Sequence, residues 1–283
     1  MKRMSIFDPN IWQADFYRQS PLFSALVPTY QQMSIKPDAW PDLNDYQNLI
    51  KSDILNRNQQ RIQFVSQSEQ CEKFEDYYEP RVFLKGEVQT RLNNWHDFFQ
   101  VLIWKIFPES KSLINDIHFQ SAKQRLKHSP PIKQRTSTEN FLTLFDECGI
   151  VIISNEPKLF ENIVEFQWQQ LFLENADLFS NKIDCFVFGH AMYEKALNPY
   201  IGMTAHAILL SVEETFFQWP LQQKLAWIDD AVCQWIENQE RLKPGLLNPF
   251  PLLGVPGWYQ GEQDKMFYQN EKYFRTSRRR KSN

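Results

Sequence analysis

The sequence predicts a single compact α+β domain built around a central buried helix, with a mixed α/β arrangement as the alternative. Short apolar runs containing β-branched residues are interspersed with longer amphipathic segments. Residues 94–107 are apolar almost all round, as helices buried in a core are. The chain has 283 residues, of which 42% are hydrophobic, so it is long enough to bury a large core. We therefore expect one globular domain over residues 1–274, followed by a basic, disordered tail over residues 275–283.

The N-terminal half is expected to begin with irregular structure and to end in helices. Residues 1–43 combine aromatic side chains with five prolines, which predicts short helices and loops lying over the core. A helix is predicted at 42–56, where apolar residues recur on one face. Strands are predicted at 61–66 and 81–85, which are apolar and contain β-branched residues. Pro108 is expected to begin a second helix directly after the buried one, because the first turn of a helix accepts proline.

The C-terminal half is expected to alternate strands with helices. Two apolar runs predict a hairpin over 140–154, because Asp146 and Gly149 stand at the first and fourth positions of a turn between them. The remaining helices and strands are predicted from apolar periodicity and from short apolar runs, respectively. The helices span 157–172, 189–198 and 221–242, and the strands span 183–188 and 205–212. The apolar segment 249–259, rich in Pro and Gly, is expected to pack against the body of the domain.

Composition argues against several classes of protein. The chain has only 8 glycines, which argues against a glycine-hinged nucleotide fold, and phosphate-loop, dinucleotide, kinase, nucleophile-elbow and zincin motifs are absent. Its four cysteines are too scattered for a zinc ribbon or a disulfide framework, so we expect reduced thiols. We expect no signal peptide, because charged residues interrupt the N-terminal segment before an apolar run of sufficient length, and we find no apolar run long enough for a transmembrane segment. We therefore expect a cytoplasmic protein.

Charge is distributed unevenly along the chain. The formal net charge is −3, but the last nine residues hold five basic side chains, so residues 1–274 carry −8. An acidic body argues against broad binding to a phosphate backbone. A basic end of this kind is typically a solvated tail. Contact of this tail with nucleic acid or anionic lipid remains an open alternative.

The first candidate site is the polar start of the buried helix. With Asn94 as the N-cap, Asp97 falls at the third helical position, where its carboxylate can complete a capping box. Gln100 lies four residues after His96 and can hydrogen-bond to its ring. Because buried polar groups need partners, His96 is either satisfied in this way, bound to a metal or catalytic.

The second candidate site lies where a buried strand changes into a helix at Gly189. The crevice at the carboxyl end of such a strand is where open α/β sheets bind ligands. His190 and Glu194 are one helical turn apart, so they can contribute to a metal site, or Glu194 can fix the tautomer of His190. The alternative is an ordinary surface His–Glu pair.

The third candidate site is the turn that contains Asp146, Glu147 and Cys148. Adjacent carboxylates at a hairpin tip are ordinary turn chemistry. Combined with His96, Asp97, His190 and Glu194, they would provide the mixed N/O ligand set that suits zinc, manganese or iron. Cys148 as a nucleophile is disfavoured, because a reactive thiolate needs an electropositive neighbourhood and this turn is acidic.

These segments predict a hydrolase of a small substrate, with either a divalent metal ion or acid/base chemistry at a His/carboxylate site. The expected roles fall into three groups. The catalytic residues are His96, His190 and Glu194, the metal ligands are His96, Asp97, Asp146 and His190, and Arg91 and Lys195 bind an anionic substrate group. The alternative is a non-enzymatic binding or scaffolding protein, whose polar residues cap helices and whose aromatic loop 249–259 docks a partner.

A family resemblance is carried by four segments, in the order GEVQTRLNNWHDFFQ, LTLFDECG, FGHAMYEKALNPYIGMTAHA and PLLGVPGWY. Together they resemble a bacterial family catalogued as domain of unknown function 3025, over residues 81–274. Two positions depart from the family pattern: Gln100 stands where Asn is more usual, and Cys148 where other residues occur, which further disfavours a thiol nucleophile. The resemblance implies no known activity, cofactor or catalytic residue.

Overall fold

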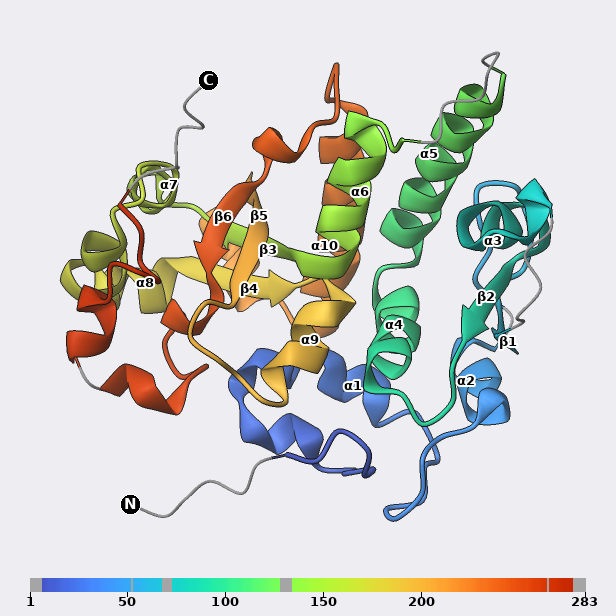
Figure 1. Cartoon of the computed structure of the whole chain (residues 1–283). Helices are drawn as coiled ribbons and strands as arrows, with labels where there is room; N and C mark the ends of the chain where they lie inside the picture. Colours follow the sequence, from blue (N-terminus) through green and yellow to red (C-terminus); the bar gives the residue numbers. More distant parts are fainter. Residues whose placement is uncertain (1–6, 52, 68–72, 128–133, 264, 277–283) are drawn as a thin grey trace.

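Helix α4 (Trp95–Ile106) is the central element of the computed structural model. It lies between a four-stranded sheet and a layer of helices and short strands (Figure 1). All its residues are buried except His96 and Lys105. The buried helix and the α+β class are thus confirmed. The structure describes residues 7–51, 53–67, 73–127, 134–263 and 265–276.

The larger sheet has the strand order β4-β3-β5-β6. Its strands are β3 (Gly149–Ser154), β4 (Ile183–Val187), β5 (Thr204–Ser211) and β6 (Asn248–Pro251). Strands β3 and β5 are parallel, whereas β4 and β6 run antiparallel to their neighbours. Every residue of β3 is buried, as expected for an apolar strand with a partner on each edge. A second, two-stranded parallel sheet pairs β1 (Gln63–Ser66) with β2 (Glu87–Thr90).

The helices surround the two sheets and α4 (Figure 1). Besides α4, they are α1 (Val27–Tyr30), α2 (Leu43–Ile50), α3 (Tyr78–Lys85), α5 (Pro108–Leu126), α6 (Ser137–Cys148), α7 (Pro157–Val164), α8 (Ala176–Lys182), α9 (His190–Ala196) and α10 (Leu221–Glu237). Short 3-10 helices precede α1 at Phe16–Gln19 and Pro21–Leu26. Among the described residues, no helix is sufficiently long and apolar to cross a membrane.

The predicted hairpin over 140–154 is wrong: its first arm is helix α6 and only its second arm is a strand, β3. A capping box begins the helix, because the Thr136 hydroxyl accepts from the Glu139 N–H and the Glu139 carboxylate accepts from the Thr136 N–H. Phe141 and Phe145 are then buried one turn apart. Asp146 and Glu147 consequently lie in the last turn of a helix and not at a hairpin tip.

The predicted strand over 81–85 is also wrong, because these residues form the second half of α3. The helix ends at Gly86, which adopts a left-handed φ of 73°. A residue with a side chain would clash at this position, since a Cβ would lie 2.0 Å from the carbonyl oxygen of Arg61. The chain continues directly into β2.

Three predicted helices end earlier than expected. Helix α2 stops at Ile50 because Lys51 takes a left-handed φ of 49°, and α7 stops at Val164 shortly before Phe166, whose φ is 58°. The chain after Phe166 re-forms as a π-helical turn at Gln170–Glu174. Helix α10 stops at Glu237, with Asn238 as its C-cap.

Other expectations are confirmed. Strands lie within or close to the predicted ranges 61–66, 183–188 and 205–212. The N-terminal segment packs on the core through aromatic rings, with Phe16 contacting Trp95, Phe98 and Phe99. Strand β6 and the chain after it pack against the body. The cysteines within the described ranges form no disulfides. Most of the predicted basic tail, residues 277–283, lies outside the described residues.

A tertiary cap fixes the start of α5, the helix that carries Lys111 and His118. The carboxylate of Asp229, on α10, accepts hydrogen bonds from the Glu109 N–H at 3.0 Å and the Ser110 N–H at 2.8 Å. Asp229 is 5% exposed. It therefore satisfies donors that a helix N-terminus leaves without intrahelical partners.

We predict that Asp229→Ala lowers the free energy of unfolding by about 1–3 kcal/mol, because at least one buried N–H loses its acceptor. Urea denaturation measures the change. The matched control is Asp230→Ala, since the neighbouring carboxylate is exposed and contacts only Gln234 on its own helix. Equal stability of the two variants would show that the cap contributes nothing.

Candidate functional site

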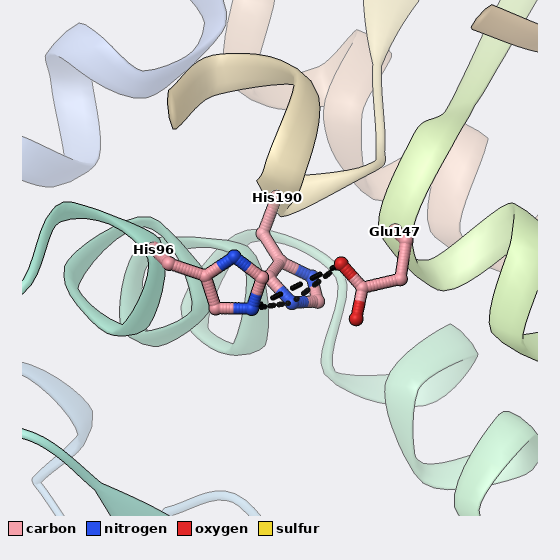
Figure 2. A group of neighbouring side chains, drawn as sticks. All are labelled: His96, Glu147 and His190. Atoms are coloured by element: carbon pink, nitrogen blue, oxygen red, sulfur yellow. Dashed lines mark hydrogen bonds and ion pairs between the residues drawn. The ribbon is translucent and has the colours of Figure 1, made fainter. Parts of the chain in front are cut away.

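Three helix ends meet at one point and bring together two imidazoles and a carboxylate. Figure 2 shows His96, near the start of α4, His190, at the start of α9, and Glu147, in the last turn of α6, pointing toward one another. Among the described residues, these three form the group of His, Cys, Asp and Glu side chains close enough to share a metal ion.

The start of α4 directs His96 toward this point. The Asn94 side chain caps the helix by accepting from the Asp97 N–H at 3.0 Å. Trp95 then turns into the aromatic core, where it is 2% exposed, so His96 faces away from that core. The predicted N-cap at Asn94 is confirmed.

A close backbone contact positions His190. At the end of β4, the N–H groups of Phe188 and Gly189 both donate to the carbonyl of Gly149, at 3.0 and 2.9 Å. A Cβ on Gly189 would lie 2.4 Å from the Glu147 carbonyl oxygen and 2.5 Å from the Cys148 nitrogen. Only glycine therefore allows the start of α9 to approach the end of α6 so closely.

The three ligand-type atoms have the spacing of a metal-binding group. The Nε2 atoms of His96 and His190 are 3.1 Å apart. Glu147 Oε2 lies 3.6 Å from His190 Nε2 and 3.9 Å from His96 Nε2. A point equidistant from these atoms is about 2.1 Å from each, which is the bond length of zinc to nitrogen or oxygen ligands.

Burial keeps His190 neutral. The residue is 1% exposed, and burial lowers the pKa of its ring to about 3, although the negative charge of Asp146 opposes the shift. Lys111 and His96 lower this pKa further by repulsion. A neutral imidazole is the form that binds metal ions.

His96 behaves differently because carboxylates surround it. Burial disfavours its charged form, but the hydrogen bond to Glu194 and the negative charges of Glu147, Glu194 and Asp97 outweigh burial, so the pKa of His96 is raised. His96 Nδ1 lies 3.1 Å from Glu194 Oε2. A carboxylate can only accept here, so Nδ1 carries the hydrogen and Nε2 faces His190 and Glu147.

Asp146 stands behind His190. Its carboxylate forms an ion pair with Lys111, whose side chain is 4% exposed, and Asp146 Oδ2 lies 3.9 Å from His190 Nδ1. Burial opposes ionisation of Asp146, but the charge of Lys111 and its hydrogen bond to the carboxylate prevail and lower the pKa of Asp146. The Asp146 carboxylate and backbone both favour a protonated His190 ring, yet neither reaches hydrogen-bond geometry with Nδ1. We therefore treat Asp146 as an electrostatic partner of His190.

The other predicted site residues have different partners from those expected. Asp97 does not form a capping box; it accepts from the Arg91 N–H, Nε and Nη2 at 2.6, 3.1 and 2.8 Å. Glu194 contacts His96 and not His190. Gln100 donates to the Tyr78 hydroxyl and not to His96. Lys195 Nζ lies 3.7 Å from Cys148 Sγ, and burial raises the pKa of that thiol.

From the sequence, Glu147 is interpreted both as turn chemistry and as part of a mixed N/O ligand set, but it is not in the final set of expected metal ligands. The signal that could have found it is the Thr136-x-x-Glu139 pattern before an apolar run, which marks a helix N-terminus. A helix beginning there ends near Gly149 and presents Glu147 in its last turn. Lys111 and Tyr78 were also missed, and their contacts depend on long-range packing.

An open pocket of about 360 Å³ adjoins the three residues. Each of its lining residues carries a polar or charged group. The other lining residues are Gln67, Tyr78, Glu79, Gln89, Arg91, Asp97, Gln100, His118, Arg135, Thr143 and Asp146. Such a lining suits a small polar ligand rather than an apolar one.

We predict that Gly189→Ala destabilises the protein by about 1–3 kcal/mol, because the added methyl group forces the ends of α6 and α9 apart. Thermal unfolding measures the loss. Gly245→Ala is the control, since nothing lies within 4 Å of a Cβ at that position. An unchanged melting temperature for Gly189→Ala would show that the close backbone contact does not constrain the site.

Comparison with known proteins gives a family without an activity. No curated protein and no solved structure matches the chain. A family model described as a protein of unknown function (DUF3025) matches residues 62–278, which is most of the chain and begins earlier than the resemblance in the sequence suggested. The chain therefore belongs to the DUF3025 family of proteins of unknown function.

Proposed function

We propose that this protein is a hydrolase of small polar substrates and that His96, His190 and Glu147 hold one divalent metal ion. The observation that carries the proposal is the convergence of two imidazole Nε2 atoms and one carboxylate oxygen around a point about 2.1 Å from each. Two histidines and one glutamate are a ligand set of catalytic zinc enzymes, in which a further position stays open for water or substrate.

Electrostatics supports a cation at this point. With the hydrogen of His96 on Nδ1, its Nε2 lone pair faces His190 Nε2 at 3.1 Å and Glu147 beside it. Either a hydrogen on His190 Nε2, donated to His96 Nε2, or a positive charge between the groups makes their approach favourable. A proton on one ring supplies that charge in the metal-free protein, consistent with the raised pKa of His96, and a divalent ion supplies it more strongly.

The surrounding residues fit hydrolysis. A bound divalent ion lowers the pKa of a water ligand and so provides a nucleophile near neutral pH. Glu194 orients the His96 ring, and the buried pair of Lys111 and Asp146 backs His190. The same ligand set also suits iron, but a pocket with polar walls retains water, which favours a hydrolytic reaction over activation of dioxygen.

The position and contacts of Arg91 support the proposal that the substrate carries an anionic group. Asp97 holds its guanidinium through Nε and Nη2, which leaves the Nη1 hydrogens for a ligand. The hydrogen bond to Asp97 raises the pKa of Arg91, so its charge is permanent. Its side chain is 52% exposed and lines the pocket. Lys195 has no part in the proposal, because its ammonium group lies against Cys148 and it does not line the pocket.

We predict that the purified protein binds about one divalent ion per chain. His96→Ala and His190→Ala should each lower the metal affinity by more than about 100-fold, which is more than the loss of a residue that only orients a ligand would cause. Elemental mass spectrometry and chelator competition measure binding. His206→Ala, on β5 and outside the pocket lining, is the control.

Hydrolysis is assayed on the same samples with small esters, amides and phosphoesters that carry an anionic group. Turnover should disappear with a chelator and return with added metal. Failure of the wild type to bind zinc, manganese or iron, or unchanged binding in a His96→Ala, His190→Ala double variant, would contradict the proposal.

We also predict that the apparent metal affinity rises with pH, because a proton on His96 competes with the metal ion. Because the pKa of His96 is raised above its usual 6.5, a proton competes with the metal below that pKa, and apparent affinity climbs with pH until His96 is neutral. His190, with a pKa of about 3, adds no slope between pH 5 and 8. Glu194→Gln removes the hydrogen-bonded carboxylate and should move the break in the curve to lower pH. Calorimetric titrations from pH 5 to 8 test this, and superimposable curves would refute the role of Glu194.

A further inference from the structure

We infer that the Tyr78 hydroxyl is a catalytic hydrogen-bond donor to the substrate oxygen that becomes negatively charged beside His96, His190 and Glu147. This inference rests on the proposed function and adds a named residue to it. Tyr78 is the first residue of α3 and lines the same pocket as the three proposed ligands.

Helix α4 places Tyr78 next to the proposed metal site through Gln100. Gln100 lies one turn after His96 on α4, so both side chains leave the same face of the helix. Gln100 Nε2 donates to the Tyr78 hydroxyl oxygen at 2.8 Å. The phenol is thereby held on the pocket wall by a residue that lies one helical turn from His96.

The direction of this hydrogen bond leaves the Tyr78 hydrogen for a ligand. An amide N–H can only donate, so the phenol oxygen is the acceptor and its own O–H points elsewhere. Among the described residues, the hydrogen bond that the Tyr78 hydroxyl makes is the one it accepts from Gln100. Its hydrogen is therefore available to a ligand in the pocket that Tyr78 lines.

Burial keeps Tyr78 in the form that donates. It raises the pKa of the phenol well above 10, and the charges of Glu79, Asp146 and Asp97 add to the shift, against the opposing hydrogen bond from Gln100. Tyr78 thus remains protonated wherever His96 and Glu147 can bind a metal ion. Two other strong donors on this wall, Arg91 and Arg135, already donate in part to Asp97 and Thr143, respectively.

A donor in this place has a defined role in hydrolysis. When hydroxide adds to a carbonyl or phosphoryl centre, a substrate oxygen gains negative charge, and a preorganised O–H group stabilises that oxygen more than it stabilises the ground state. The expected signature is a loss in kcat with little change in KM. A purely structural Tyr78, which only packs α3 against α4, would change stability and leave this signature absent.

The test uses the full chain loaded with Co²⁺, whose visible spectrum reports on its ligands, and inorganic phosphate as a tetrahedral oxyanion probe. Tyr78→Phe should weaken phosphate binding by about 10-fold or more, with Co²⁺ affinity unchanged. Tyr77→Phe is the matched control, because the neighbouring ring is 54% exposed and does not line the pocket. Gln100→Leu, which frees the phenol, should give a partial loss.

The outcomes separate this inference from the proposed function. Equal phosphate affinity in wild type and Tyr78→Phe, or no spectral response of the Co²⁺-loaded wild type to phosphate, would overturn the role of Tyr78 and leave the metal site standing. Failure of the wild type to bind Co²⁺ would overturn the proposed function and this inference with it. Where a hydrolysable substrate is in hand, a 10- to 100-fold lower kcat at similar KM gives independent support.

Discussion

The backbone contact between the end of α6 and the start of α9 is the constraint on which the site depends. Gly189 meets the Glu147 carbonyl with no room for a Cβ, and its N–H and that of Phe188 share the Gly149 carbonyl. The contact extends the antiparallel pairing of β3 with β4 by one step beyond the sheet. Because the two helices begin and end at this junction, the carboxylate of Glu147 and the ring of His190 can approach each other only while it is intact.

An ion pair beside this junction offsets the free-energy cost of burying charged groups there. A lone lysine or aspartate would be costly in this position, but Lys111 and Asp146 form an ion pair, and Lys111 lowers the pKa of Asp146. Their pair also lies against His190, which burial keeps neutral. His96, on the open side, has a carboxylate partner and a raised pKa. The pKa values of His96 and His190 are thus shifted in opposite directions although their Nε2 atoms are 3.1 Å apart, and a divalent ion bound to both would require both rings to be neutral.

Helix caps and strand ends could be predicted from the sequence, whereas the tertiary contacts of individual side chains could not. Asn94 caps α4 and Gly189 ends β4 as predicted, since both effects act within a few residues. The prediction of a turn around Gly149 was wrong because this glycine serves close packing and not a turn. Its φ is an ordinary −71°, and a Cβ would lie 2.3 Å from the Phe145 carbonyl oxygen. Glu194 pairs with His96, not with His190 on its own helix, because the packing of α9 against α4 decides which ring it reaches.

X-ray absorption spectroscopy of the metal-loaded protein tests the central claim most directly, since it reports the atoms around the ion. The geometry predicts a first shell of nitrogen and oxygen atoms at about 2.0–2.1 Å, with the outer-shell scattering of two imidazole rings. A His190→Ala sample should show the scattering of one ring at most. A first shell without imidazole scattering, or one that contains sulfur, would place the ion elsewhere and contradict a metal centre formed by His96, His190 and Glu147.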